Sequence, residues 1–201
     1  MRKKLAIFFA VIMWFSVIAQ FIIMLQNRVA DVPETIIRFF SFFTVLTNTL
    51  VAIYFTAVIV DVSFTSKPGV LTAITAYIFM VGIVYQFVLR HLWQPTGMQL
   101  VVDELLHTLN PVLVIIYWYL YEDKAAVNYG LVKWWLIYPL CYLSYALIRG
   151  ELSGFYPYPF INVSKIGLQQ ALINSAGLAL IFFVVGCLFI LIGKKLLLRT
   201  R

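Results

Sequence analysis

The sequence predicts an all-α protein, a polytopic membrane bundle of six transmembrane helices that forms one domain over residues 1–201. Only 11% of the residues are charged, whereas soluble domains carry roughly 25%. The mean hydropathy is +0.96. Apolar stretches of about 20 residues, the length that crosses the hydrocarbon core, recur along the chain. No hydrophilic stretch between them is long enough for a separate soluble domain.

The expected helices occupy residues 5–25, 36–60, 69–92, 99–120, 131–149 and 170–193. The first follows a basic start at Arg2, Lys3 and Lys4. Its apolar run exceeds the h-region of about 7–15 residues in a signal peptide, so we expect a helix that stays attached. Short turn-forming segments, 61–68 and 121–130, separate the helices on one side. Segments 26–35, 91–98 and 150–168 connect them on the other side.

The basic residues predict the orientation of the bundle. With six spans, both termini share a side, and the other side holds five basic residues: Arg28, Arg38, Arg90, Arg149 and Lys165. The terminal side holds ten: Arg2, Lys3, Lys4, Lys67, Lys124, Lys133, Lys194, Lys195, Arg199 and Arg201. The positive-inside rule therefore predicts a multi-pass protein of the cell membrane with both termini in the cytoplasm. The net charge of +7 reflects this topology, and no phosphate loop or basic–aromatic array indicates nucleic acid.

Polar residues recur at helical spacing in the outer halves of five expected helices, whereas the inner halves are almost wholly apolar. They are Arg38, Ser41, Thr44 and Asn48; Tyr85, Gln86 and Arg90; Asp103, His107 and Asn110; Tyr138, Tyr142, Tyr145 and Arg149; and Gln169, Gln170, Asn174 and Ser175. Such residues can simply hydrogen-bond helices to one another. Their convergence at one level favours a polar chamber that opens toward the outer leaflet.

His107 is the most informative of these residues, because an ionisable group within the bilayer is costly and is a functional-site candidate by default. Thr44 and His107 each lie about eight residues into helices that begin on the same side, which gives both a depth of about 12 Å. A threonine hydroxyl needs a general base within hydrogen-bond reach, and a buried neutral imidazole can accept its proton. Asp103, or alternatively Asn110, is expected to orient the imidazole. A structural buried histidine is the competing interpretation.

The remaining polar residues are candidates for binding a substrate in the chamber. They are Ser41, Thr47, Asn48, Tyr85, Gln86, Arg90, Asn110, Tyr142, Tyr145, Arg149 and Asn174. Among them Asn48, Asn174, Tyr142 and Arg90 compete for the role of oxyanion donor. Segment 150–168, whose run 155–160 is too rich in proline for a helix, forms either a cap over the chamber or an aromatic anchor at the interface.

Two alternatives involve bound groups: a bis-histidine haem site using His91 and His107, and a metal site at Asp103, Glu104 and His107. Against haem, His91 is expected at the membrane edge, about half a helix above His107. Against a metal, a lone transmembrane histidine supplies too few ligands. We therefore expect no cofactor and no metal. The sequence indicates a membrane lipid or fatty-acyl ester as the partner, and it indicates no protein partner.

Three segments resemble a known family. They are residues 39–48 (FFSFFTVLTN), 107–111 (HTLNP), and Arg149-Gly150 leading to the run 154–160 (GFYPYPF). They are similar to bacterial relatives of the androgen-induced gene 1 family of integral membrane proteins, in the same order and over nearly the whole chain. The mammalian members, which include the androgen-dependent TFPI-regulating protein, are threonine hydrolases that cleave fatty acid esters of hydroxy fatty acids. The resemblance implies a catalytic threonine at Thr44, or at Thr47 one turn away, and a catalytic histidine at His107.

The sequence thus predicts an intramembrane threonine hydrolase that cleaves esters of fatty-acyl lipids in an outer-leaflet cavity. An apolar inner half suits an acyl chain while the ester lies among the polar residues. The alternative is a non-catalytic membrane protein that binds or transports a lipid or small molecule in the same cavity.

Overall fold

A computed structural model describes residues 1–92 and 94–199, and this part of the chain is helical without a β-strand. Two predictions concern residues outside this range: the side of the membrane on which Arg201 lies, and the part of connection 91–98 that contains Trp93. The main helices are α1 (Arg2–Gln26), α2 (Val32–Phe40), α3 (Phe43–Ile59), α4 (Val70–Val84), α5 (Gly97–Glu104), α6 (Asn110–Tyr121), α8 (Ile137–Ser153) and α10 (Leu168–Arg199). Shorter helical segments are η1 (Ser63–Ser66), η2 (Tyr85–Leu89), η3 (Leu105–Leu109), η4 (Tyr129–Leu131), α7 (Val132–Trp135), η5 (Pro159–Ile161) and α9 (Val163–Ile166).

The prediction of a multi-pass helical membrane protein is confirmed in its coarse form. Five continuous helical stretches are long and apolar enough to cross a membrane, with mean hydropathies from 1.4 to 2.8. They cover Arg2–Gln26, Val70–Leu89, Gly97–Tyr121, Tyr129–Ser153 and Leu168–Leu198. The pair α2 and α3 is a sixth candidate only if the two helices count as one bent span. The described chain therefore has five helical stretches able to cross a membrane, or six with this pair.

The expectation of a continuous helix over residues 36–60 is wrong. Helix α2 ends at Phe40, and α3 begins at Phe43 at an angle of 73° to it. Phe42 between them is extended, with φ −84° and ψ 127°. Composition alone hides this bend, because the residues on both sides of it are apolar.

Two tyrosines of α8 satisfy polar groups at the bend. The Tyr142 hydroxyl donates to the Ser41 carbonyl at 3.0 Å, and the Tyr145 hydroxyl lies 2.9 Å from the Ser41 hydroxyl. Non-helical backbone at membrane depth persists only where protein or a cavity satisfies its polar groups. The tyrosine stripe of α8, predicted as part of a chamber wall, therefore holds the bend in place.

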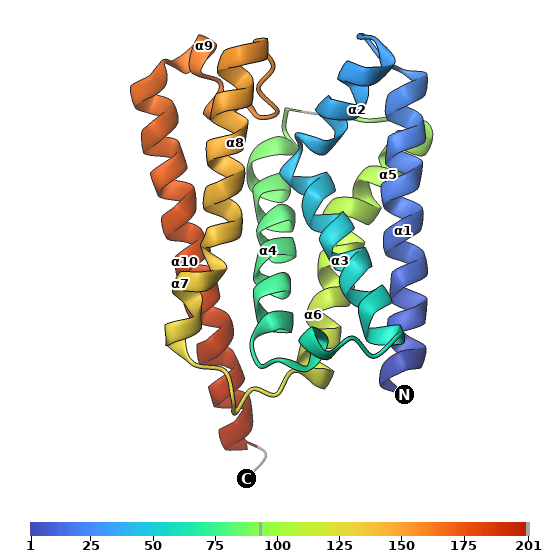
Figure 1. Cartoon of the computed structure of the whole chain (residues 1–201), viewed down its shortest axis with the longest axis vertical. Helices are drawn as coiled ribbons and strands as arrows, with labels where there is room; N and C mark the ends of the chain where they lie inside the picture. Colours follow the sequence, from blue (N-terminus) through green and yellow to red (C-terminus); the bar gives the residue numbers. More distant parts are fainter. Residues whose placement is uncertain (93, 200–201) are drawn as a thin grey trace.

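The elements form two groups around α4 (Figure 1). Helices α8 and α10 lie side by side at one edge, while α1, α3 and the continuous α5–η3–α6 segment pack on the other side of α4. The start of α1 and the end of α10 lie at one end of the bundle, and α2, α9 and segment 154–162 lie at the opposite end. We call the latter the capped end.

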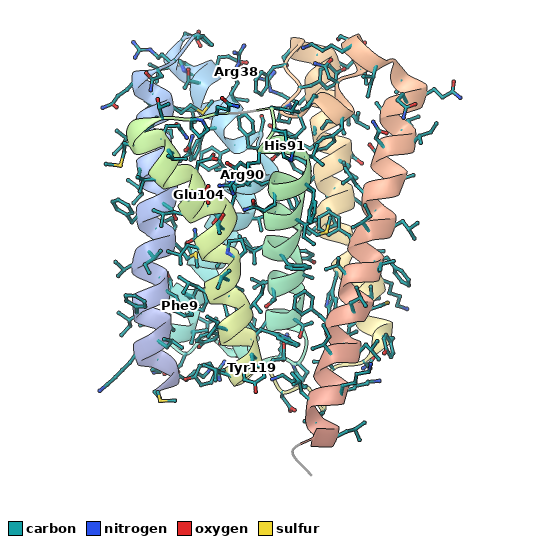
Figure 2. The ribbon with its side chains drawn as sticks, turned by 180° about the vertical axis from the view of Figure 1, so that it is seen from behind. Phe9, Arg38, Arg90, His91, Glu104 and Tyr119 are labelled. Carbon is teal, nitrogen blue, oxygen red and sulfur yellow. The ribbon has the colours of Figure 1, made fainter. Side chains whose placement is uncertain are left out.

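The half of the bundle near the termini contains the apolar core. Its buried side chains come from α1, α3, α4, α6 and α10 and include Phe9, Phe55, Ile78, Val114 and Phe189. Phe9 and Tyr119 lie in this half, whereas Arg38, Arg90, His91 and Glu104 lie toward the capped end (Figure 2). The polar residues thus gather in the half of the bundle where the sequence predicts a chamber.

Candidate functional site

Thr44 is the second residue of α3, directly after the bend. The first amide groups of a helix have no partner within the helix and must find one elsewhere, and the Thr44 amide donates to the Tyr158 hydroxyl at 3.3 Å. The Thr44 side chain is buried, and it lines two cavities at once. Because of the bend, the Thr44 amide has no carbonyl partner from a preceding helical turn. A continuous helix would have covered this amide with its own carbonyl groups.

His107 pairs with Thr44. The distance from His107 Nε2 to Thr44 Oγ1 is 3.3 Å, and both side chains are buried. The other ring nitrogen, Nδ1, lies 2.9 Å from the backbone carbonyl oxygen of Asp103. A carbonyl only accepts hydrogen bonds, so Nδ1 is the protonated nitrogen. In the neutral ring Nε2 then presents its lone pair to the Thr44 hydroxyl.

The carboxylate of Asp103 is a weaker partner of His107 than the sequence predicts. Its Oδ1 atom lies 3.4 Å from His107 Nδ1, farther than the carbonyl oxygen of the same residue. The Oδ2 atom is buried and has no hydrogen-bond partner among the described residues. Asp103 also lines the larger cavity. Its backbone therefore fixes the tautomer of His107, and its buried carboxyl group lies beside the imidazole.

Two π-helical turns carry the imidazole and its aromatic neighbour. His107 lies in η3, and Tyr85 lies in η2. The two rings stack with centroids 4.1 Å apart and an angle of 15° between their planes. Turns of this kind are rare and are frequent at functional sites, because the extra residue redirects a side chain. Gly82 permits the close approach of the two segments, since a Cβ there would lie 3.2 Å from the His107 carbonyl oxygen.

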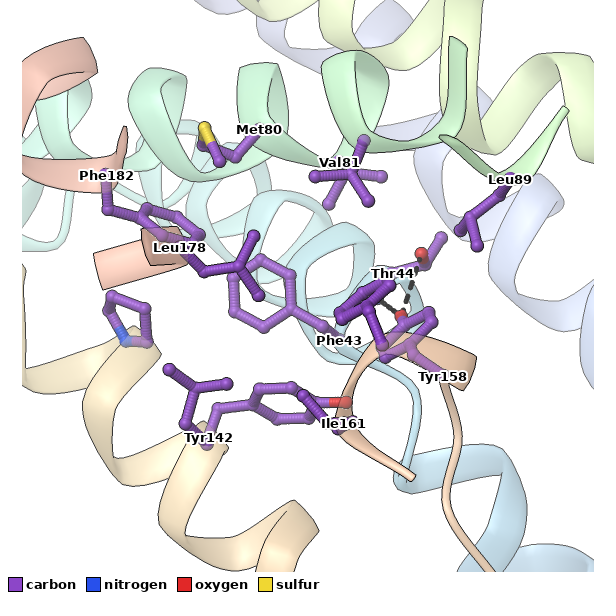
Figure 3. Close-up of a pocket in the computed structure, with 14 residues that line it drawn as sticks. Phe43, Thr44, Met80, Val81, Leu89, Tyr142, Tyr158, Ile161, Leu178 and Phe182 are labelled. Carbon is purple, nitrogen blue, oxygen red and sulfur yellow. Dashed lines mark hydrogen bonds between the residues drawn. The ribbon is translucent and has the colours of Figure 1, made fainter. Parts of the chain in front are cut away.

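Tyr158 is a site residue that the sequence-based prediction missed. Its hydroxyl accepts a hydrogen bond from the Thr44 amide at 3.3 Å and lies 3.4 Å from Thr44 Oγ1 (Figure 3). The tyrosine belongs to the predicted aromatic segment 150–168, which here folds inward over the site. Burial raises the pKa of the Tyr158 phenol above its ordinary value. Tyr158 is therefore neutral and able to donate a hydrogen bond at physiological pH.

Two further contacts hold segment 154–162 in place beside the bond between Tyr158 and Thr44. The Asn174 side chain of α10 donates to the Phe160 carbonyl at 2.8 Å. The ring of Tyr156 lies against Gly150, where an added Cβ would fall 2.0 Å from the ring. The Tyr158 ring itself stacks on Phe160 with centroids 5.2 Å apart. Of the two interpretations of this segment, the structure favours a cap over an anchor at the interface.

The larger cavity has a volume of about 610 Å³ and lies under the cap. Its walls come from the ends of α1, α2 and α3, from η2, α5 and η3, and from the cap residues Phe155, Pro157, Tyr158 and Pro159. The lining is mainly apolar. Thr44, His107 and Asp103 form its polar floor, and Arg28 and Arg38 lie among the residues toward the capped end.

The smaller cavity has a volume of about 50 Å³, and Thr44 lies at its edge (Figure 3). Apolar residues of α3, α4, α8, α10 and η5 surround it, among them Phe43, Val81, Leu178 and Phe182. Thr44 and Tyr158 line both cavities, whereas His107 and Asp103 line only the larger one. Thr44 therefore lies at the junction of two compartments with different lining.

Most of the other predicted binding residues hold elements together instead of lining the larger cavity. Of the predicted binding residues, only Tyr85 lines the larger cavity, and Tyr142 lines the smaller cavity. Asn48 donates to the Thr44 carbonyl at 2.9 Å and to the Leu106 carbonyl at 3.3 Å. Asn110 donates to Asn48 at 2.7 Å and to Ser16 at 2.9 Å. The prediction that Asn110 orients His107 is therefore wrong, because its side chain bonds to Asn48 and Ser16. The network that it forms with Asn48 fixes α3 against η3.

The remaining pairings are also structural. Thr47 bonds to the Tyr138 hydroxyl at 3.1 Å, so the hydroxyl that meets His107 is that of Thr44. At the capped end, the partners of the basic side chains are carboxylates and amides. Arg149 donates to Glu34 at 2.6 Å, and Arg38 donates to the same carboxylate at 2.8 Å. Arg90 donates to Gln86 at 2.7 Å and also to Glu104. Gln86 in turn donates to Thr108 at 2.9 Å. Ser41 and Tyr145 support the bend, and Asn174 supports the cap.

Within residues 1–92 and 94–199, no three histidine, cysteine, aspartate or glutamate side chains are grouped so that they could hold a metal ion. Glu104, named in the metal alternative, accepts hydrogen bonds from Arg90 and Thr108 instead. The chain matches no family model, no curated protein and no solved structure.

Proposed function

We propose that the protein is an intramembrane hydrolase that cleaves an ester of a lipid through Thr44 and His107. The observation that carries the proposal is the tautomer of His107, whose unprotonated Nε2 lies 3.3 Å from the Thr44 hydroxyl in a buried site. A buried base in hydrogen-bond contact with a hydroxyl is the arrangement that activates such a nucleophile. The mostly apolar cavity of about 610 Å³ supports a lipid as the substrate.

In the first half of the reaction, Thr44 Oγ1 attacks the ester carbonyl and His107 Nε2 takes its proton. The carbonyl oxygen becomes an oxyanion beside the Thr44 amide and the Tyr158 hydroxyl, which are both donors. The oxyanion replaces Tyr158 as the acceptor of the Thr44 N–H and receives a second bond from the Tyr158 O–H. The C–O bond of the ester then breaks, His107 returns the proton to the departing alcohol, and the acyl group remains on Thr44.

In the second half, water takes the place of the alcohol. His107 removes a proton from this water, which attacks the acyl carbon, and the proton returns to Thr44 Oγ1 as the acid leaves. Asp103 stabilises the imidazolium that exists during both halves, since its carboxylate lies 3.4 Å from Nδ1. His107 thus serves first as the base and then as the acid in each half of the reaction.

We further propose that the bent α2–α3 pair acts as a sixth span, with both termini in the cytoplasm and the capped end facing outward across the cell membrane. The excess of basic residues on the terminal side supports this orientation. The substrate then reaches the cavity from the outer leaflet. The resemblance to the androgen-induced gene 1 family makes fatty acid esters of hydroxy fatty acids, whose acyl group is long, one class of ester to test, beside esters of shorter acids.

The test is hydrolysis of fluorogenic esters of short and of long fatty acids by the purified protein and three variants. Thr44→Ala and His107→Ala are each expected to abolish turnover. Thr47→Ala, a buried threonine of the same helix that pairs with Tyr138, is expected to retain it. Loss of turnover in Thr47→Ala alone would assign the nucleophile to Thr47. If the wild type binds a labelled lipid but cleaves no ester, the protein is a lipid-binding or transport protein.

A further inference from the structure

The two cavities that meet at Thr44 differ in size and in the groups that line them. The larger one, of about 610 Å³, is lined by His107 and Asp103. The smaller one, of about 50 Å³, has neither of these residues, and its walls are almost wholly apolar (Figure 3). An ester bound at Thr44 has two halves, and each half must extend into one of these compartments.

The position of His107 determines which half goes where. The departing alcohol oxygen must receive its proton from His107 Nε2, so the alcohol half lies on the side of the imidazole. That side is the larger cavity. The water that later replaces the alcohol must also reach His107, and it arrives by the same cavity. The acyl half therefore points away from His107, past Thr44, into the smaller cavity.

The volume of the smaller cavity limits the acyl group. A space of 10–15 Å³ holds about one group of water or methyl size, so 50 Å³ holds about four such groups. Phe43, Val81, Leu178 and Phe182 surround this space, and three of these residues come from three different helices that pack closely. The Tyr142 hydroxyl, the polar group of this wall, is already bonded to the Ser41 carbonyl. The compartment thus suits a short unsubstituted acyl chain.

We propose that the site is selective for esters that join a short acyl group, of about two to five carbons, to a large apolar alcohol. The larger cavity binds the alcohol and the smaller cavity binds the acyl group. This inference rests on the proposed hydrolase function and specifies its substrate class: esters with a short acyl group are expected to be cleaved faster than fatty acid esters of hydroxy fatty acids, whose acyl group is long. It predicts that selectivity for acyl length is set at the smaller cavity, by residues that never contact the alcohol.

The test compares 4-methylumbelliferyl esters of acetate, butyrate, octanoate and dodecanoate with the full-length protein in detergent. The wild type is expected to hydrolyse the acetate and butyrate at least tenfold faster, in kcat/KM, than the octanoate and dodecanoate, because each methylene group that a pocket cannot hold costs about tenfold or more.

Leu178 offers a pair of variants at one half-buried position of α10. Leu178→Ala enlarges the smaller cavity and is expected to raise octanoate turnover relative to acetate at least threefold. Leu178→Phe fills the cavity and is expected to lower butyrate turnover relative to acetate. Leu172→Ala, an exposed position of the same helix outside both cavities, is the control and leaves these ratios unchanged.

The outcomes separate the two proposals. Equal hydrolysis of short and long acyl esters by the wild type, or Leu178 variants that change all chain lengths by one factor, would overturn the selectivity while leaving the hydrolase in place. An absence of hydrolysis for every ester would overturn the hydrolase and the selectivity together. A second enlarging variant, Phe182→Leu, answers the same question if Leu178→Ala does not fold.

Discussion

The Nε2 atom of His107 lies 3.3 Å from the hydroxyl oxygen of Thr44, although the two residues are 63 positions apart in the chain. The contact depends on two features of the backbone and one side-chain network. The bend between α2 and α3 places Thr44 in the first turn of a helix. The π-helical turn η3 carries His107. The network of Asn48 and Asn110 holds these two segments together.

The first prediction concerns His107 as the base. Replacing it by glutamine keeps a polar side chain in the site but removes the group that takes up the proton of Thr44. We expect His107→Gln to lower kcat by about 10²–10⁴-fold, the usual contribution of general acid–base catalysis. Single-turnover kinetics with a fluorogenic ester measure this effect. A kcat within twofold of the wild type would show that His107 has a structural role only.

The second prediction concerns Tyr158 as an oxyanion donor. Tyr158→Phe keeps the ring that stacks on Phe160 but removes the hydroxyl, and the loss of one such donor costs about 10²–10³-fold in kcat. The KM should change little, since this bond strengthens only in the transition state.

The pH dependence of this variant is a further check. The raised pKa of Tyr158 keeps its phenol protonated in the folded protein well past neutral pH, so ionisation would remove the donor only in strong alkali. The ratio of wild-type to Tyr158→Phe kcat should therefore be constant between pH 6 and pH 9. A ratio that declines within this range would mean that Tyr158 titrates there and acts as an acid.

The third prediction concerns the cap. Gly150→Ala places a Cβ 2.0 Å from the Tyr156 ring, so the ring must move and shift the segment that carries Tyr158. We expect a loss of about 1–3 kcal/mol in stability from the overpacking, together with reduced activity. Thermal unfolding in detergent and ester turnover measure the two effects.

Gly177→Ala is the matched control for Gly150→Ala. Gly177 also lies in a helix, but an added Cβ would meet nothing within 4 Å. Alanine there should keep activity and raise stability by about 0.5–1 kcal/mol, the usual gain over glycine in a helix. Equal destabilisation by both variants would contradict the packing of Tyr156 on Gly150.

The fourth prediction concerns the asparagine network beneath the site. Asn110→Ala removes a buried side chain and leaves Asn48 Oδ1 without this donor. An unsatisfied buried polar group costs about 1–3 kcal/mol, which should appear as a lower unfolding temperature. Activity should fall at the same time because α3 shifts against η3. Gln170→Ala, an exposed amide on α10, is the control and should leave the unfolding temperature unchanged.

The helical fold and its apolar stretches follow from the sequence because membrane spanning demands long apolar helices, and composition records this directly. The shared depth of Thr44 and His107 was also predictable, since it depends on residue counts along two helices. The bend at Ser41 and Phe42 and the π-helical turns were not. Both are backbone conformations fixed by partners distant in sequence, such as Tyr142 for the Ser41 carbonyl.

The dependence on partners distant in sequence also explains why the spacing of the polar residues predicts more binding residues than line the larger cavity. Spacing shows that Asn48, Asn110 and Arg149 share faces with site residues, but it does not show that they already form hydrogen bonds with other polar side chains. Tyr158 was missed for the opposite reason. It lies outside any helix, so no periodicity points to it, and only the fold of segment 154–162 brings its hydroxyl to Thr44.

The central claim is that the Thr44 hydroxyl is the nucleophile. A fluorophosphonate probe reacts with an activated hydroxyl to form a stable adduct, and mass spectrometry of the digested protein locates it. The account predicts one adduct on the peptide that contains Thr44 in the wild type, and none in Thr44→Ala or His107→Ala. An adduct at another residue, or equal labelling of Thr44→Ala, would contradict it.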